Sequence, residues 1–530
     1  MKRQASILLA VLLALPLVGL STGFAQDGLT VVWGEDRSDH STLDPRVTQS
    51  RHEEQMILQI FDPLIYRDGQ DFYPGLATSW EVSDDDLSWT FQLREGVTFH
   101  DGTPFNAEAV KFTFDSIQDP ELGSQGAIDV LGPYASTEIL GDLEVRVNFE
   151  RPYAAALSAF SETELSIVSP TAVQELGNDG FARNPVGTGP FKFVSWEAGL
   201  RVTLERNEDY NWAPAFYDHQ GPSEVERVVL RFIPDTSTRV AALEAGEINI
   251  ADLVTPLDLL SYQSDPDFGT MVGNVAGLPF SIMFNTTRGP LMDPLVRQAF
   301  MHAVDRPRLA ENLFFGFAAP AYGPLSASTP LYWDGVESYY NYDPERAMAL
   351  LEQAGWTDSD GDGVREKDGE ELSLFFPSLL EPDTAVAVQA EVAKVGFDVQ
   401  VENVLKARQD ELIFANDYDV LVIRWVSNDP GVLIIPFHSR NIPEPGIFKF
   451  NWSRIDDPVL DQLLEDAEAA TSPDERAALY QQIQQMIMDG ATFFALHDQL
   501  QMVAFSSDFS GFRFAPGNWQ VRFYDVTRAN

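Results

Sequence analysis

The chain has 530 residues, no cysteine, and 81 Asp and Glu against 35 Lys and Arg, a formal net charge of −46 at pH 7. The length exceeds an ordinary single domain, and the missing cysteine excludes disulfides, thiolate metal sites, a cysteine nucleophile and a lipidated N-terminal cysteine. The negative charge argues against nucleic acid, whose phosphates need a basic surface, and against anionic membrane surfaces.

The N-terminus has the pattern of a secretory signal peptide. Lys2 and Arg3 precede an apolar run from Ile7 to Val18, and Gly23-Phe24-Ala25 places small residues before Gln26. The pattern predicts cleavage after residue 25. The apolar run is too short to span a bilayer, which takes about 20 residues. We therefore expect a periplasmic, monomeric chain that is neither membrane-spanning nor lipid-anchored.

The rest of the chain alternates strand-like and helix-like segments, which predicts an α/β protein. The clearest unit is a β-branched strand at 228–233, a helix at 236–245, Gly246 and a second strand at 248–250. Asp235 or Thr236 can cap the helix, and glycine suits the left-handed position that ends it. These features predict a β-α-β unit.

Three helices of the C-terminal half are marked by proline at their first position. Asp343, Asp457 and Ser472 each precede such a proline, and Ser472 with Glu475 matches a capping box. Their apolar residues recur at helical spacing, which is typical of core-facing helices.

No catalytic motif is recognisable. The chain lacks a nucleophile elbow, a P-loop, a dinucleotide-binding glycine motif and an H-E-x-x-H zinc motif, and its seven histidines are not at helical ligand spacing. We expect His100 to hydrogen-bond locally. Paired carboxylates are so abundant that a hydrolase using two of them remains an alternative.

One segment matches the start of a calcium loop. Asp358, Asp360 and Asp362 occupy positions 1, 3 and 5, with glycine at position 6 and Glu366 at position 9. Position 12 is Gly369, where the loop needs a bidentate glutamate. The alternative is an Asp-rich hairpin turn, which uses the same residue types. We expect no cofactor, with structural calcium at this loop the weaker alternative.

Residues 76–110 contain the most specific pattern in the chain. Leu76-Ala-Thr-Ser-Trp80 is followed by an alternating strand pattern at 87–93, a turn at Asp101-Gly102 and a helix cap at Asn106. This stretch resembles the signature of family 5 extracellular solute-binding proteins, the periplasmic dipeptide, oligopeptide and nickel receptors of ABC importers. Further matches follow in the family's order across nearly the whole mature chain: 184–191, 231–251, Asn285, 293–299, 342–344, Trp356, 418–420, Trp425, 429–430 and 459–461.

The resemblance implies a periplasmic-binding-protein-like type II fold, with two lobes, a hinge and a domain inserted in lobe one. Lobe one would comprise 26–72, 184–283 and 500–530, the insert 73–183, and lobe two 284–499. Chain crossings near Phe280–Asn285 and Leu496–Val503 would form the hinge.

The resemblance also suggests ligand-binding residues. In peptide-binding relatives, a Trp in lobe two is followed three residues later by an Asp that pairs with the peptide ammonium. Trp425 matches that Trp, but Asn428 stands at the Asp position and Asp429 follows it. An ammonium in a closed cleft needs a carboxylate, so Asp429 is the candidate counter-ion, and the alternative is that Asp429-Pro430 forms only a turn. Weaker candidates are Arg424 and Arg440, for a ligand carboxylate, and Arg51 and His52 in lobe one.

These features predict a non-enzymatic receptor that captures a peptide or similarly sized polar solute and delivers it to an ABC permease. The alternatives are a nickel chelate, an oligosaccharide or an opine as ligand, or a secreted hydrolase that uses two carboxylates. A periplasmic sensor partner or chaperone is a further class that the sequence leaves open.

Overall fold

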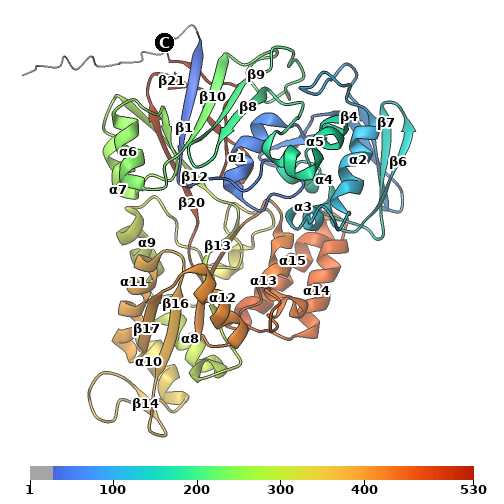
Figure 1. Cartoon of the computed structure of the whole chain (residues 1–530). Helices are drawn as coiled ribbons and strands as arrows, with labels where there is room; N and C mark the ends of the chain where they lie inside the picture. The colour runs from blue at the N-terminus through green and yellow to red at the C-terminus, as the bar shows by residue number, and fades with distance from the viewer. Residues whose placement is uncertain (1–27, 518, 530) are drawn as a thin grey trace, which may run out of the picture.

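The computed structural model describes residues 28–517 and 519–529, and the predicted signal peptide lies outside these ranges. Two lobes lie one above the other, with a further sheet and its helices beside the upper lobe (Figure 1). Within the described part of the chain, no helix is long and apolar enough to cross a bilayer.

Lobe one is built on a seven-stranded sheet of order β12-β20-β11-β1-β10-β9-β8. Its strands are β1 (Leu29–Glu35), β8 (Phe191–Glu197), β9 (Arg201–Arg206), β10 (Val225–Phe232), β11 (Ile250–Ala251), β12 (Phe268–Asn274) and β20 (Leu500–Ser506). The predicted β-α-β unit is β10, α6 (Thr236–Glu244) and β11, with β1 parallel to both strands and between them. Asp235 caps α6 by accepting a hydrogen bond from the Thr238 N–H.

Other short elements complete lobe one. They are α1 (Arg51–Ile60), α7 (Pro256–Tyr262), β2 (Ile65–Asp68), β3 (Asp71–Pro74), β21 (Phe509–Ser510), β22 (Arg513–Phe514), β23 (Val521–Arg522) and β24 (Thr527–Arg528). Helix α1 is fixed to the C-terminal segment, because Gln55 and Gln59 both donate to the Val521 carbonyl.

The insert is a four-stranded antiparallel sheet covered by helices. Its strands, in the order β4-β5-β7-β6, are β4 (Ala77–Val82), β5 (Ser88–Leu93), β7 (Glu144–Phe149) and β6 (Tyr134–Gly141). Its helices are α2 (Ala107–Ile117), α3 (Gly126–Leu131), α4 (Ala156–Ala159) and α5 (Pro170–Arg183). Asn106 caps α2 as predicted, and Phe91, Val110 and Phe114 are buried in the insert's core.

Lobe two has a three-stranded sheet, β18-β13-β19, and a parallel pair, β16 and β17. The strands are β13 (Gly277–Phe284), β14 (Glu366–Lys367), β15 (Glu370–Glu371), β16 (Ser373–Ser378), β17 (Asp398–Asn403), β18 (Val420–Val426) and β19 (Phe493–His497). The helices are α8 (Pro294–His302), α9 (Arg306–Phe314), α10 (Pro344–Gln353), α11 (Pro382–Val392), α12 (Lys406–Ala415), α13 (Ile434–Phe437), α14 (Pro458–Ala469) and α15 (Pro473–Asp489).

The three proline-marked helices are confirmed as α10, α14 and α15. Asp343 and Asp457 accept capping hydrogen bonds from backbone N–H groups. Ser472 precedes α15 but its side chain makes no capping hydrogen bond, so the capping box predicted there is wrong.

The chain passes between the lobes at two adjacent crossings. Val275–Ala276 joins β12 to β13, and Asp498–Gln499 joins β19 to β20, with the Val275 N–H donating to the Gln499 carbonyl at 2.9 Å. The second crossing lies within the predicted 496–503. The predicted first boundary, at residue 283, falls inside β13, so by sheet membership lobe two begins earlier, at about residue 277.

Candidate ligand-binding cleft

The carboxyl end of β18 brings lobe two against lobe one and the insert. The Arg51 Nη2 donates to the Val426 carbonyl at 3.3 Å, and the Arg67 Nη1 donates to the Asn428 carbonyl at 3.0 Å. The Asn428 amide in turn donates to Glu162 of the insert at 3.1 Å. Asn428, a predicted ligand residue, therefore lies where the two lobes meet.

The first of two charged clusters at this boundary is the arginine cluster, Arg51, Glu54, Glu162 and Glu164. One guanidinium nitrogen of Arg51 lies 2.7 Å from Glu54, 3.9 Å from Glu162 and 3.8 Å from Glu164. Burial raises the pKa of Glu54 well above its usual value, against the opposing effect of Arg51. Burial lowers the pKa of Arg51, but the surrounding carboxylates outweigh it and leave that pKa raised. Arg51 therefore stays charged and compensates its neighbours.

A small cavity of about 40 Å³ adjoins the arginine cluster, lined by residues that include Arg51, Glu162, Asn428 and Arg522. It has room for the end of a solute or a few water molecules. The Arg522 guanidinium packs over the Phe216 ring, 4.6 Å from its centroid, and its buried Nη1 has no hydrogen-bond partner. A carboxylate entering the cavity would satisfy this nitrogen.

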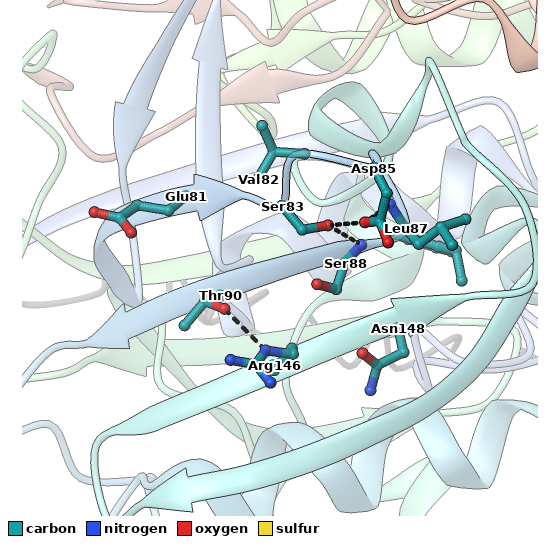
Figure 2. Close-up of a pocket in the computed structure, with 10 residues that line it drawn as sticks. Glu81, Val82, Ser83, Asp85, Leu87, Ser88, Thr90, Arg146 and Asn148 are labelled. Atoms are coloured by element: carbon teal, nitrogen blue, oxygen red, sulfur yellow. Dashed lines mark hydrogen bonds between the residues drawn. The ribbon is translucent and has the colours of Figure 1, made fainter.

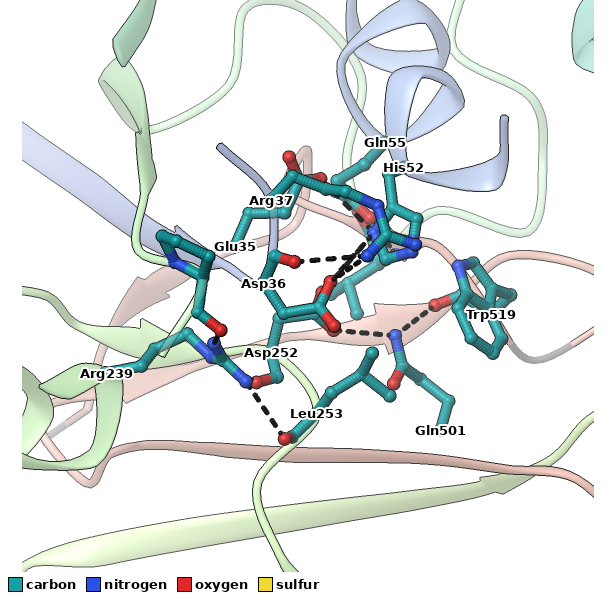
Figure 3. Close-up of polar contacts among 12 residues, drawn as sticks. Glu35, Asp36, Arg37, His52, Gln55, Arg239, Asp252, Leu253, Gln501 and Trp519 are labelled. Atoms are coloured by element: carbon teal, nitrogen blue, oxygen red, sulfur yellow. Dashed lines mark hydrogen bonds and ion pairs between the residues drawn. The ribbon is translucent and has the colours of Figure 1, made fainter. Parts of the chain in front are cut away.

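The second cluster is the histidine cluster, Glu35, Asp36, His52 and Asp252, at the carboxyl ends of β1 and β11 (Figure 3). The Nδ1 of His52 lies 3.5 Å from Asp36, 3.8 Å from Glu35 and 3.8 Å from Asp252. Strands β1 and β11 run parallel and pair Gly34 with Ala251, so the next residue of each strand, Glu35 and Asp252, emerges at the same sheet edge.

Burial sets the charges in the histidine cluster. It lowers the pKa of His52 to about 3, so the imidazole is neutral at pH 7. It raises the pKa of Glu35 and of Asp36, and it raises the pKa of Asp252 well above its usual value. The second oxygen of Glu35 lies 2.6 Å from His40 Nε2. Unlike Arg51, His52 contributes no positive charge to its carboxylate neighbours.

Arg424 faces the histidine cluster from lobe two. Its side chain makes no hydrogen bond or ion pair with any residue in the described ranges. Burial lowers the pKa of Arg424, and the nearby charges are Glu381 of its own lobe with Arg37 and Asp36 of lobe one. A half-buried guanidinium without a partner in the described ranges, facing from one lobe to the other, is suited to bind an anionic ligand group.

Trp425 and Asp429, two further predicted residues, have partners within lobe two. Trp425 lies in β18 and packs edge-on against Phe450, with ring centroids 4.9 Å apart. Asp429 caps the short 3₁₀ helix Pro430–Leu433 through the Gly431 N–H and forms a 2.8 Å ion pair with Arg476. The Asp429 carboxylate therefore already has a cationic partner from a helix of its own lobe, and its role as counter-ion of a ligand ammonium stays a prediction.

Arg440 is exposed in the 3₁₀ helix Ser439–Asn441 and lowers the pKa of Asp129 in the insert, against the larger raising effect of burial. It therefore lies at the rim between insert and lobe two.

His100 is not bonded locally, because its Nε2 lies 2.9 Å from the carbonyl of Gly189, far along the chain.

The loop at 358–366 projects from the far end of lobe two and leads into the hairpin β14–β15 (Figure 1). Oxygens of Asp358, Asp360 and Glu366 lie within 4.8 Å of one another. Asp358 accepts hydrogen bonds from the N–H groups of Gly361 and Gly363, and Asp362 accepts one from Val364. These are the bonds of an Asp-rich turn, and calcium binding at Asp358, Asp360 and Asp362 stays a prediction.

A larger hollow of about 440 Å³ lies on the insert's sheet (Figure 2). Its lining comes from β4, β5, β7 and the adjoining turn, and includes Glu81, Asp85 and Arg146. None of its lining residues belongs to lobe two.

The sequence did not single out Glu35, Asp36, Asp252, Glu162, Glu164 or Arg522. A usable signal existed for Glu35 and Asp252, because each directly follows an apolar strand of a predicted parallel unit. Ligands of open α/β sheets bind at the carboxyl ends of such strands. The positions of Glu162, Glu164 and Arg522 depend on how the insert and the C-terminal segment pack on α1.

Comparisons with known proteins identify the class. The sequence model of the bacterial extracellular solute-binding proteins, family 5, middle part, matches residues 71–441. The chain therefore belongs to this family, and the two-lobed fold is the fold of its solved members.

Individual relatives span most of the chain. A putative ABC transporter peptide-binding protein of Brucella ovis is 29% identical over 439 residues, covering 81% of this chain and 79% of the relative. The nickel-binding periplasmic protein of Escherichia coli K12 is 26% identical, with 88% and 89% coverage. The structure of NikA from Brucella suis in complex with Fe(III)-EDTA superposes with a TM-score of 0.84 at 25% identity, covering 94% of this chain and all of that one.

Proposed function

We propose that this protein is the periplasmic receptor of an ABC importer, and that it captures a peptide-sized polar solute between its lobes for delivery to a membrane permease. The observation that carries the proposal is the pair of crossings at Val275–Ala276 and Asp498–Gln499, beside which polar groups of both lobes face one another. Family membership and the named relatives support it.

The solute carries at least one anionic group in this proposal. Within the described ranges, the guanidinium group of Arg424 in lobe two and the Nη1 atom of Arg522 in lobe one have no carboxylate partner, and each suits a carboxylate. A peptide and a carboxylate-bearing metal chelate share this chemistry. One relative is named as a peptide-binding protein, and the similar NikA structure is a complex with Fe(III)-EDTA. An ammonium group of the ligand would lie against Glu162, which lines the cavity. Asp429 could bind the ammonium only if its ion pair with Arg476 were broken.

The receptor acts by binding and closure, without chemical conversion of the solute. In this proposal the protein is a monomer. The signal-peptide pattern supports its export, and the absence of cysteine supports a form without a lipidated cysteine. In this proposal, closure of the two lobes adds hydrogen bonds between them. Such bonds already join Arg51, Arg67 and Glu162 to the 426–428 segment of lobe two.

Mass spectrometry of solute released from natively purified protein tests the proposal. We expect an intact small polar molecule with a carboxylate, which raises the melting temperature when it is added back. A hundredfold excess over Kd adds about 2.7 kcal/mol to the free energy of unfolding. A solute that comes back cleaved would indicate a hydrolase, and a thermal shift that survives in Arg424→Met would exclude Arg424 as an anchor.

A further inference from the structure

We propose that Glu35, His52 and Asp252 form a binding site for a divalent transition-metal ion in lobe one. The three side chains come from the end of β1, the first turn of α1 and the residue after β11, and they converge on one point (Figure 3). One oxygen or nitrogen of each lies within 4.8 Å of the others.

The three residues are buried, and the carboxylate of Asp252 accepts one hydrogen bond, from Gln501, whereas the groups of Glu35 and His52 that face each other lack partners in the described ranges. Glu35 is 0% exposed, Asp252 2% and His52 6%. The Glu35 Oε1 that faces His52 has no hydrogen-bond partner, and the imidazole makes no hydrogen bond with any residue in the described ranges. Buried polar atoms are nearly always satisfied. A cation between these groups would satisfy them together.

The two distances from His52 to the carboxylates favour a metal over an ammonium ion. Nδ1 of His52 lies 3.8 Å from Glu35 Oε1 and 3.8 Å from Asp252 Oδ2, too far for direct hydrogen bonds. Ligands about 2.1 Å from a tetrahedral ion lie about 3.4 Å apart. Acceptors about 2.9 Å from an ammonium nitrogen lie about 4.7 Å apart by the same geometry. The observed distances to His52 are nearer to those expected for a metal.

Neighbouring charges define the ion further. Asp36, 3.5 Å from His52 Nδ1 and partly exposed, supplies a fourth oxygen on the side open to solvent and pairs with the exposed Arg37. Arg239 donates to the carbonyls of Asp252, Ile233 and Leu253, so its guanidinium is directed at the backbone. A mixed imidazole and carboxylate set favours Zn²⁺, Ni²⁺ or Mn²⁺ over Mg²⁺.

All these donors belong to lobe one, so the site needs neither closure nor an organic solute. The inference therefore goes beyond the proposed function and can fail or succeed separately from it. Arg424 faces the cluster from lobe two, and a bound metal would reduce the local negative charge that it experiences.

Calorimetry on the mature chain, stripped with a chelator and dialysed, tests the site with ZnCl₂, MnCl₂ and MgCl₂ alone. We expect one Zn²⁺ per chain, with Mg²⁺ not competing at equal concentration. His52→Gln should weaken Zn²⁺ binding at least about tenfold, since even second-shell changes cost 10–100-fold. Asp252→Asn should act in the same direction. Asp360→Asn, in the exposed acidic loop, is the matched control and should leave the affinity unchanged.

Several results would overturn the site. They are no zinc binding by the wild type, equal zinc affinity in His52→Gln, or loss of zinc binding in Asp360→Asn. Displacement of zinc by methylammonium would assign the cluster to organic cations instead. Circular dichroism checks folding of each variant, and Asp252→Asn decides the case if His52→Gln does not fold. Anomalous scattering at the zinc edge from crystals of the loaded protein would place the ion.

Discussion

Arg51 and His52 are consecutive residues in the first turn of α1, and each meets three carboxylates. Arg51 remains charged and lies 2.7 Å from Glu54, so the arginine cluster is compensated within the protein. His52 becomes neutral on burial, with a pKa of about 3, so it supplies no positive charge to its three carboxylate neighbours. Glu35 and Asp36 contact His40 and Arg37 instead. The comparison shows that acidic side chains beside a permanently charged arginine have a cationic partner within the protein. Acidic side chains beside a neutral histidine lack that charge, and we propose that a ligand supplies it.

The same contrast separates other charged groups at the lobe boundary. Asp429 is paired with Arg476 at 2.8 Å, whereas Arg424 has no partner in the described ranges. Asp498, at the second crossing, has a buried oxygen without a partner. Substitution of a charged group that has an oppositely charged partner should lower the free energy of unfolding. Substitution of a charged group without such a partner should change ligand affinity or the pH dependence of stability.

The largest effect is expected from Arg51→Met. The substitution leaves Glu54, Glu162 and Glu164 without their shared cation, and breaking a buried pair costs about 3 kcal/mol or more. Urea unfolding at pH 7 should show a loss of this size. Arg201→Met, which removes an exposed pair with Glu197, should change the free energy of unfolding by less than about 1 kcal/mol. Equal losses in both variants would break the distinction between the clusters.

Asp498→Asn should stabilise the protein at high pH. Asp498 is 4% exposed, and burial raises its pKa to about 6, against the opposing effects of Ser326 and His497. The folded state therefore holds the proton more tightly than the unfolded state. The stability this gives is present below the unfolded pKa and is lost as pH rises through about 6.

The Asn side chain stays neutral, so the variant should exceed the wild type by roughly 3 kcal/mol at pH 8 and match it near pH 4. Urea titrations across this range measure the difference. Asp508→Asn, at an exposed position, should show no such pH dependence. A constant difference at all pH values would mean that titration of Asp498 is not its source.

Asp429→Asn should cost about 1.5 kcal/mol of stability, because it removes the charged partner of Arg476. If the ligand ammonium displaces Arg476 and binds Asp429, the variant should also lose about thirtyfold in affinity. Denaturation and ligand calorimetry on the same variant separate the two roles. Unchanged affinity would remove Asp429 from the ligand site, and Asp267→Asn serves as the exposed control.

Arg424→Met should have the smallest effect on stability, within about 0.5 kcal/mol, because no partner loses its counter-ion. Its effect on affinity for a carboxylate-bearing solute should be at least about tenfold, since a buried charge pair with the ligand is lost. Isothermal titration with the solute released from the native protein measures this effect. Arg408→Met, an exposed arginine of α12, should leave the affinity unchanged.

The sequence by itself determined the family, the α/β class and many local elements. The motif at 76–110, the cap at Asn106 and the β10-α6-β11 unit depend on periodicity and on hydrogen bonds between near neighbours, which short segments specify. Through the resemblance it also predicted Asn428 and His52 as ligand residues, and that role stays a prediction.

Only the tertiary structure decided which charges are compensated. The pairing of Asp429 with Arg476 joins a loop to a distant helix, and the histidine cluster exists because parallel strands align Glu35 with Asp252. The sequence shows that these residues are charged, but compensation depends on distances of a few ångströms between segments far apart in the chain. Burial then fixes the protonation state of each group, and burial is a property of the packed lobes.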